Sequence, residues 1–393
     1  MVVHSDFPHD VRVAREVRAA IDDGLDVYVV ATRRPGELRR EIVDGADVHR
    51  LAISHRRGAG ALGAFAEYVA FALLAALRVG RLSLRRRFDV VQVHNPPDFL
   101  IGAALLPKLL GARIVFDVHD LSSDMFAMRF PSAWWTPAVE RGLRAIERVA
   151  CRAADVVVTV HEPYRLELIR RGAAADKTLV VLNTVDETLL PRPPRRPTRT
   201  PFRIVYHGSV TPHYGVELLV RALAEVIERV PDARLEIYGE GDAVRQLAAE
   251  AAALGVATRL TMTGELLPHV EVLRHVDGAS VGVIPNLPTR LNQFALSTKL
   301  FEYVALGVPV LSADLPTIRD HFSDSEITYF RAGDAHSLAD AIVAIAGDFE
   351  EALRRAAAAK HRYEASYGWE VQAKSYATAL RRLAAQRDRR RRS

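Results

Sequence analysis

The sequence lacks several features that would place it in well-known broad classes of protein. Its single cysteine, Cys151, excludes an internal disulfide and is typical of a reducing compartment. Residues 1–10 include no long apolar segment, so no signal peptide is visible. No histidines or cysteines have the close spacing of a zinc site. No aromatic residues alternate with the arginines, which argues against nucleic-acid binding. We therefore expect a cytoplasmic protein without a bound metal.

The length and charge of the chain favour two domains and an anionic partner. Its 393 residues are 49% hydrophobic and 26% charged, which is ordinary for a globular protein of two domains. The net charge of +5 comes mainly from arginine clusters at residues 85–87, 192–199 and 389–392. Such clusters attract lipid head groups or nucleotide phosphates, or they are simply solvated.

Apolar segments of strand length alternate with segments of helical period in the first half of the chain. This alternation predicts an α/β fold with a doubly wound parallel sheet. The first strand looks short because little precedes Ser5, which indicates a trimmed start or a frayed sheet edge. The other expected strands are residues 27–30, 48–51, 90–94, 114–119, 156–160 and 179–182, and the expected helices are residues 11–24, 61–79, 100–110 and 134–153.

A second α/β series follows a segment that is rich in proline and arginine. Residues 191–201 read PRPPRRPTRTP, which fits neither a helix nor a sheet interior. We therefore expect an N-terminal domain at residues 1–190, a linker, and a C-terminal domain at residues 202–369. A final helix at residues 370–387 is expected to pack back onto the first domain. The expected strands of the second domain are residues 203–206, 234–238, 260–263, 280–284, 308–312 and 328–330, and its helices are residues 216–230, 243–254, 269–275, 298–306 and 336–346.

Polar residues follow three neighbouring strands of the predicted first sheet. His94 and Asn95 end one strand, His119 and Asp120 end the next, and His161 ends a third. Ligands of doubly wound sheets bind outside the carboxyl ends of the strands. The interpretation we favour is hydrogen bonding to a polyhydroxylated ligand. Metal binding, or a structural role for each histidine, is the alternative.

In the second half, a helix is predicted to begin at Ser297 and Thr298. Lys299 and Glu302 are spaced so that they share one helix face. The free N–H groups and positive dipole at a helix start suit a phosphate, and Lys299 adds a full charge. An ordinary surface Lys–Glu pair is the alternative. Gly208 ends an earlier strand at a turn where backbone N–H groups can approach an anion.

The order of these motifs resembles glycosyltransferase family 4. The second half has Gly208, then YGEGD, then TGELLPHVEVLRHVDGASVGVIP and KLFEYVALGVPVL; the first has FDVVQVHN, VFDVHD and LNTVD. The likeness covers nearly the whole chain, and the FEYVALGVPV segment is its most specific part. It implies the GT-B fold, in which two Rossmann-like domains face a cleft. It also implies a retaining transfer of a sugar from a nucleoside diphosphate, with no metal or other cofactor.

The resemblance assigns expected roles to individual residues. Glu302 matches the glutamate that holds the donor ribose, and Ser297, Thr298 and Lys299 match positions beside the diphosphate. His119 matches a histidine near the donor sugar. We expect His119 and Lys299 to be catalytic and His94, Asn95, Asp120 and His161 to lie on the acceptor side. The remaining expected donor-binding residues are Gly208, Ser209, Thr263, Leu266 and Arg290.

The sequence departs from the family pattern at three positions. Phe294 stands where a second glutamate is frequent, and Ser209 and Tyr214 replace the usual phosphate cations. Lys299, with Arg290 or His213, must then stabilise the leaving diphosphate, or the enzyme is weak or inactive. These departures leave open a non-catalytic nucleotide-sugar binder. A GT-B nucleotide-sugar epimerase is a separate alternative.

Residues 59–84 form a largely apolar segment that ends at three arginines. Glu67 and Arg78 interrupt it and its apolar core is too short, so we do not expect a transmembrane span. A buried crossover helix is one interpretation. The other is peripheral contact with an anionic membrane at the inner face of the plasma membrane, for a lipid-linked acceptor. Glycans are the other expected acceptors, in the synthesis of cell-surface polysaccharide or glycoconjugates.

Overall fold

The computed structural model describes residues 1–53, 61–130, 134–289, 292–294 and 296–392. The chain forms two compact units, Met1–Asn183 with Gln372–Ser393, and Thr184–Val371. The first domain was expected to extend to residue 190, but residues 184–190 group with the second unit. Helix α14 (Trp369–Arg392) joins the first unit from Gln372 onward, where the Gln372 side chain accepts a hydrogen bond from Leu182 N at 3.1 Å.

The first unit is built on a sheet with the strand order β3-β4-β2-β1-β5-β6-β7-β8 among the described residues. Neighbouring strands are parallel, except that β3 pairs antiparallel with β4. β1 lies between β2 and β5, so the expectation of a frayed edge strand is wrong. The strands are β1 (Val2–Asp6), β2 (Tyr28–Thr32), β3 (Arg40–Val43), β4 (Ala46–Leu51), β5 (Val90–His94), β6 (Arg113–Val118), β7 (Val156–Thr159) and β8 (Thr178–Val180).

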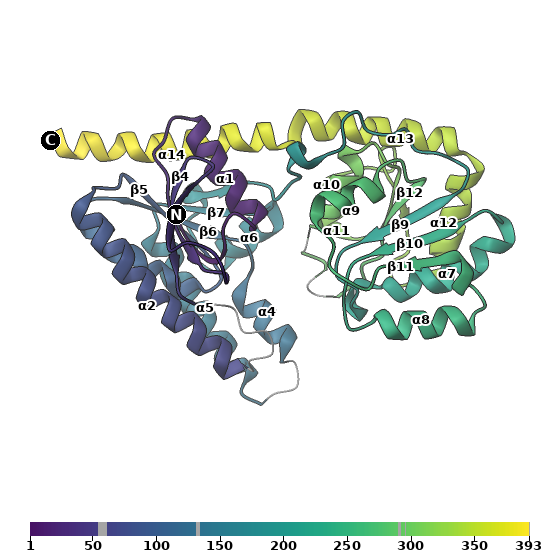
Figure 1. Ribbon diagram of the computed structural model, residues 1–393, viewed down its shortest axis with the longest axis horizontal. Helices are drawn as coiled ribbons and strands as arrows, with labels where there is room; N and C mark the ends of the chain where they lie inside the picture. The colour runs from purple at the N-terminus through teal and green to yellow at the C-terminus, as the bar shows by residue number, and fades with distance from the viewer. Residues whose placement is uncertain (54–60, 131–133, 290–291, 295, 393) are drawn as a thin grey trace. The chain divides into compact units, whose positions relative to one another are not determined.

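Helices cover both faces of this sheet (Figure 1). On one face, Arg12 of α1 and Tyr376 of α14 reach side chains of the central strands. On the other face, Phe71 of α2 and Leu100 of the 3₁₀ helix η1 (Asp98–Ala104) are buried in one apolar cluster with strand residues. The α-helices of this unit before α14 are α1 (Val11–Asp22), α2 (Ala61–Arg85), α3 (Leu105–Leu109), α4 (Ser122–Arg129), α5 (Thr136–Ala153) and α6 (Glu162–Arg170).

The second unit has a parallel sheet with the order β11-β10-β9-β12-β13-β14 among the described residues, with helices on both faces (Figure 1). Its strands are β9 (Arg203–His207), β10 (Arg234–Tyr238), β11 (Leu260–Met262), β12 (Val281–Ile284), β13 (Val310–Ala313) and β14 (Thr328–Phe330). Its α-helices before α14 are α7 (Val216–Arg229), α8 (Val244–Ala253), α9 (His269–Val276), α10 (Thr298–Ala305), α11 (Pro316–Arg319), α12 (Ala335–Gly347) and α13 (Phe349–Arg362).

Two glycines allow close approaches that place the loops and helix of the second unit. A Cβ on Gly282 of β12 would lie 2.5 Å from the ring of Tyr303, so α10 packs directly on this strand. A Cβ on Gly239 would lie 2.0 Å from the carbonyl oxygen of Gly208. The YGEG motif therefore brings the loop after β10 against the loop after β9.

Helix α2 is more exposed than a buried crossover helix would be. The most apolar 18-residue window within Gly63–Arg85 has a mean hydropathy of 1.5, and 22% of that window is buried. By length and composition this one helix of the described residues could cross a membrane, although Glu67 and Arg78 interrupt its apolar core. Its exposed apolar side chains include Leu73, Leu77 and Leu84, which are 63%, 53% and 71% exposed. The interpretation as a buried crossover helix is therefore not supported.

Candidate functional site

The candidate site in the second unit begins where α10 starts. Ser297 is the N-cap and has an extended backbone (φ −74°, ψ 127°), but its side chain does not cap the helix among the described residues. The first turn therefore keeps backbone N–H groups that can donate hydrogen bonds to a ligand. Leu300, Phe301 and Val304 are fully buried, and they fix the helix against the sheet. This agrees with the predicted helix start.

Lys299 is a buried cation that aromatic rings surround. Its side chain passes close to Gly208. A Cβ built on Gly208 would lie 3.4 Å from both Cε and Nζ of Lys299. The ammonium lies 4.5 Å from the ring centre of Tyr206 and 5.1 Å from that of Tyr214, and it donates to Tyr206 Oη at 3.4 Å. No carboxylate of the described residues lies within ion-pair distance of Nζ. Burial lowers the pKa of Lys299 to about 8, and the charge of Glu302 opposes the shift only in part.

Glu302 lies one turn further along α10 and is only 4% exposed. Its Oε2 is 3.0 Å from His207 Nε2, and its Oε1 is 3.3 Å from His269 Nε2. Burial alone would raise the pKa of Glu302, but the charges and hydrogen bonds of the two histidines outweigh burial and hold this pKa well below its usual range. The carboxylate is therefore ionised, and each oxygen keeps a lone pair for a ligand hydroxyl.

The other predicted donor-side residues surround these two in different ways. Gly208 has a φ of 114°, and the exposed Ser209 follows it. Thr263 Oγ1 accepts a hydrogen bond from Gly239 N at 3.0 Å, so this side chain holds the loop after β10. Leu266 is 69% exposed beyond β11. Arg290 lies outside the described residues.

In the first unit, His94 and His119 meet as the sequence predicts, and Asp117 joins them. His94 Nδ1 lies 3.1 Å from His119 Nε2, and Asp117 Oδ2 lies 3.2 Å from the first atom and 3.3 Å from the second. His94 and Asp117 are fully buried, while the side chain of His119 is 17% exposed. His119 is therefore the member of the group that a ligand can reach. These three residues could together hold a metal ion.

Further buried polar groups surround Asp117. Arg12 Nη2 donates to Asp117 Oδ1 at 2.8 Å, and Gln92 Nε2 donates to Glu16 Oε2 at 2.7 Å. Burial alone would raise the pKa of Asp117, but Arg12 and the two histidines outweigh burial and hold this pKa well below its usual range. Burial and the charge of Asp117 raise the pKa of Glu16 well above its usual value. The surroundings therefore favour the ionised form of Asp117 and disfavour the ionised form of Glu16.

Asn95 links the loops that follow β5 and β6. Its Nδ2 donates to Asp98 Oδ1 and to the carbonyl oxygen of Asp120, both at 2.7 Å, and its Oδ1 accepts from His119 N at 2.7 Å. Burial raises the pKa of Asp98 to about 6 and also raises the pKa of Asp120. Asn95 is only 3% exposed, so its amide positions His119 and Asp120, which are themselves partly exposed.

His161 follows the third strand, but its side chain serves the next helix. Its Nδ1 accepts a hydrogen bond from Tyr164 N at 3.3 Å at the N-terminus of α6. The residue is 2% exposed, and its ring packs at a tilt of 53° against the ring of Tyr164, with ring centres 4.2 Å apart. This geometry gives His161 a helix-capping role, which agrees with the structural alternative for this histidine.

Sequence reasoning missed Asp117, Arg12, His269 and the contact of His207 with Glu302. Two of these had a signal in the pattern. Asp117 lies in β6 and pairs in register with His94, and His119 follows two positions later, just past the end of that strand. Arg12 is on the face of α1 that covers the sheet, as the helical period of the buried residues in this segment indicates. His269 begins a helix after a loop, and no periodicity places it beside Glu302.

Comparison with known proteins identifies the family. Residues 201–348 match the family described as glycosyl transferases group 1, and residues 9–184 match the glycosyl transferase 4-like domain. A phosphatidyl-myo-inositol mannosyltransferase of Mycobacterium leprae is 32% identical over 144 residues, which is 34% of each chain. The protein thus spans about a third of the length of that relative.

Solved structures agree on the fold. Sucrose-phosphate synthase from Thermosynechococcus elongatus superposes with a TM-score of 0.74 at 18% identity, over 98% of this chain and 96% of the other. HepE from Anabaena, solved in complex with UDP and glucose, has a TM-score of 0.69 at 16% identity, over 96% and 98% of the two chains. With two family matches that together cover most of its length, the chain belongs to the group 1 glycosyltransferases and has the GT-B fold.

Proposed function

We propose that the protein is a retaining glycosyltransferase that moves a sugar from a nucleoside-diphosphate-sugar to a hydroxyl of a glycan or lipid-linked acceptor. The observation that carries this proposal is the pair on α10. Lys299 is a buried cation without a carboxylate within ion-pair distance among the described residues, and it lies beside free N–H groups. Glu302 on the same helix is held ionised by two histidines. At this spacing, the cation suits a diphosphate, and the carboxylate can accept hydrogen bonds from the hydroxyls of the attached ribose.

Each group then has one role in donor binding. The backbone N–H groups of Ser297, Thr298 and Lys299 meet the diphosphate, and the Lys299 ammonium neutralises the charge that grows on the leaving phosphate. Glu302 accepts hydrogen bonds from the ribose hydroxyls. HepE was solved in complex with UDP and glucose, which supports a nucleoside diphosphate as the donor group.

The transfer exchanges one bond for another at the anomeric carbon. The bond from this carbon to the diphosphate oxygen breaks first, and the sugar gains oxocarbenium character. The acceptor hydroxyl attacks from the same face, and the leaving phosphate takes its proton. The products are a glycoside and a nucleoside diphosphate, so no protein nucleophile and no resident cofactor takes part. His119, positioned by Asn95 and Asp117, orients the donor sugar in this scheme.

A lipid-linked acceptor at the inner face of the plasma membrane is the acceptor class with most support. Helix α2 exposes Leu73, Leu77 and Leu84, and the arginines at residues 85–87 follow at its C-terminal end. Apolar side chains beside cations are the composition of a surface that lies on an anionic membrane. The mannosyltransferase relative is named for a phosphatidyl-inositol, which is also a lipid.

One observation favours a second candidate, a nucleotide-sugar binder without transferase activity. Ser209 and Tyr214 leave Lys299 as the one described cation beside Gly208, so the leaving group has less stabilisation than two further cations would give. A nucleotide-sugar epimerase with the same fold is a third candidate.

A donor screen separates the three candidates. The purified protein is incubated with UDP-, GDP- and ADP-sugars, with and without membrane lipid extract, and products are followed by mass spectrometry. Release of nucleoside diphosphate with formation of a glycoside of retained configuration supports the transferase. Tight donor binding without turnover supports the binder, and an epimerised sugar nucleotide supports the epimerase.

A further inference from the structure

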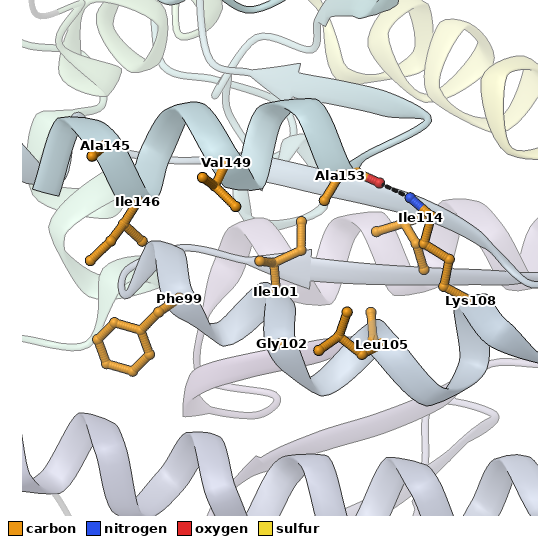
Figure 2. A pocket seen from close by; sticks show the side chains of 11 residues that line it. Phe99, Ile101, Gly102, Leu105, Lys108, Ile114, Ala145, Ile146, Val149 and Ala153 are labelled. Carbon is orange, nitrogen blue, oxygen red and sulfur yellow. Dashed lines mark hydrogen bonds between the residues drawn. The ribbon is translucent and has the colours of Figure 1, made fainter.

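We propose that an apolar groove of the first unit holds the hydrocarbon chain of the lipid-linked acceptor. The proposal rests on the proposed function, because it names the acceptor class of the same enzyme. The groove has a volume of about 400 Å³ and lies between α5 on one side and η1 with α3 on the other (Figure 2). Its walls are formed mainly by Phe99, Ile101, Leu105, Ile146 and Val149.

The groove lining suits a chain that carries no polar groups. Apart from backbone, Lys108 is the one polar side chain among the lining residues. An extended peptide would bring N–H and C=O groups that find no hydrogen-bond partners on this surface. Each group buried without a partner would cost binding free energy. A volume of about 400 Å³ also lies in the usual range for small-molecule sites, roughly 300–1,000 Å³. A methylene chain fills such a space without unpaired polar atoms.

The two ends of the groove differ, and the difference sets the direction of the chain. At one end, the Lys108 ammonium donates to the carbonyl oxygen of Ala153, as Figure 2 shows. At the other end, Phe99 directly follows Asp98, whose carboxylate accepts hydrogen bonds from Asn95 and Ser122. The groove therefore starts beside the loop that positions His119 and Asp120. A hydroxylated head group at these residues would direct its chain into the groove.

The surface around the groove matches an anionic lipid layer, from which such an acceptor would come. Leu105, Leu109 and Val149 are 61%, 84% and 63% exposed. Helix α2 packs against η1 and α3, and it exposes leucines of its own. The exposed Lys108 and Arg152 add positive charge beside the groove. Charge and apolar area together favour a lipid over a second protein chain.

Gly102 offers a way to fill the groove without disturbing the fold. It lines the groove, and a Cβ built on it meets no atom within 4 Å. Gly102→Leu therefore places a side chain in the space proposed for methylene groups. Gly347→Leu is the matched control, because Gly347 ends α12 in the second unit and its Cβ also meets nothing within 4 Å. Val149→Asp is a second variant, which places a charge on the exposed wall.

The test uses the full chain with phosphatidylglycerol that carries a diazirine near the end of one acyl chain, in mixed phosphatidylcholine vesicles. We expect crosslinks to peptides of residues 99–109 and 145–153 in the wild type and in Gly347→Leu. Gly102→Leu and Val149→Asp should lower this crosslinking at least about tenfold, because a few methylene groups of the acyl chain can no longer be buried in the groove. Unchanged crosslinking in both variants, or crosslinks confined to α2, would overturn the proposal.

Two further measurements separate this proposal from other outcomes. Calorimetry with UDP- and GDP-sugars should give the same donor affinity for the wild type and Gly102→Leu. If neither protein binds a donor while the crosslinks appear as expected, the proposed function fails and the groove proposal stands as a lipid site. Light scattering that shows a wild-type dimer and a Gly102→Leu monomer would overturn the proposal in favour of a protein–protein interface.

Discussion

The carboxyl edges of the two sheets keep buried charge in different ways. In the first unit, Asp117 has Arg12, His94 and His119 as partners, so the charges are paired within the chain. In the second unit, Lys299 rests on the rings of Tyr206 and Tyr214, and no carboxylate of the described residues is within ion-pair distance. A paired network is stabilising while all its members are present. A buried cation without such a partner lowers the stability of the fold, and an anionic ligand that binds beside it raises that stability again.

The comparison is tested most strongly at Arg12. Arg12→Met should lower the free energy of unfolding by about 3–5 kcal/mol, because Asp117 is left as a buried charge with less compensation. Urea denaturation measures this loss. Arg245→Met on the exposed face of α8 is the control and should change the free energy by less than about 0.5 kcal/mol. A loss at Arg12 no larger than at Arg245 would show that the network does not stabilise the first unit.

The opposite result is expected at Lys299. Lys299→Met should lower the transfer rate about 10²–10³-fold, because the leaving diphosphate loses its cation. The midpoint of thermal unfolding should stay the same or rise, since a buried charge has been removed. Steady-state kinetics and calorimetric unfolding measure the two effects. Lys177→Met, at an exposed lysine of the first unit, should change neither. Strong destabilisation by Lys299→Met would mean that the lysine is structural.

Glu302 should give a smaller effect, confined to binding. Glu302→Gln keeps the shape but removes the charge, so donor affinity should fall about 10–100-fold through weaker hydrogen bonds to the ribose. Calorimetric titration with a nucleotide sugar measures the change, and circular dichroism checks the fold. Glu228→Gln on the exposed side of α7 serves as control. Unchanged affinity would remove Glu302 from the donor site.

Per pH unit, the smallest expected effect is the dependence of stability and donor affinity on pH above 8. The folded pKa of Lys299 is about 8 and its reference value is 10.5, so the unfolded chain binds more protons between these values. The stability of the unliganded protein should therefore rise with pH in this window, relative to Lys299→Met. Donor affinity should fall over the same window, by at most about tenfold per pH unit, because the diphosphate needs the charged lysine. Parallel pH profiles of the wild type and Lys299→Met would contradict this origin.

The sequence was sufficient to predict the α/β class, the α10 helix start and the meeting of His94 with His119. These follow from local period and from the rule that parallel strands end at one edge. It was not sufficient for the place of β1, because a short strand of five residues looks the same at an edge or in the centre. Strand β3 was missed because its alternating polar residues resemble a loop.

The site was predicted less completely than the fold, for a physical reason. The partners of Glu302 come from β9 and from the first residue of α9, and the approach of these residues depends on loop paths. The aromatic contacts of Lys299 likewise depend on Tyr214 lying over it, whereas the sequence indicated only that Tyr214 replaces a cation. Side chains that are positioned by loops follow no periodic pattern in the sequence, so their contacts could not be predicted from it.

The central claim is that Lys299 provides the positive charge for a nucleoside diphosphate. Its most direct test is a calorimetric comparison of UDP, GDP and ADP with uridine, guanosine and adenosine, for the wild type and Lys299→Met at pH 7. We predict that one diphosphate binds the wild type at least about tenfold more tightly than its nucleoside, and that Lys299→Met removes most of this difference. An equal preference for the diphosphate in both proteins would contradict the account.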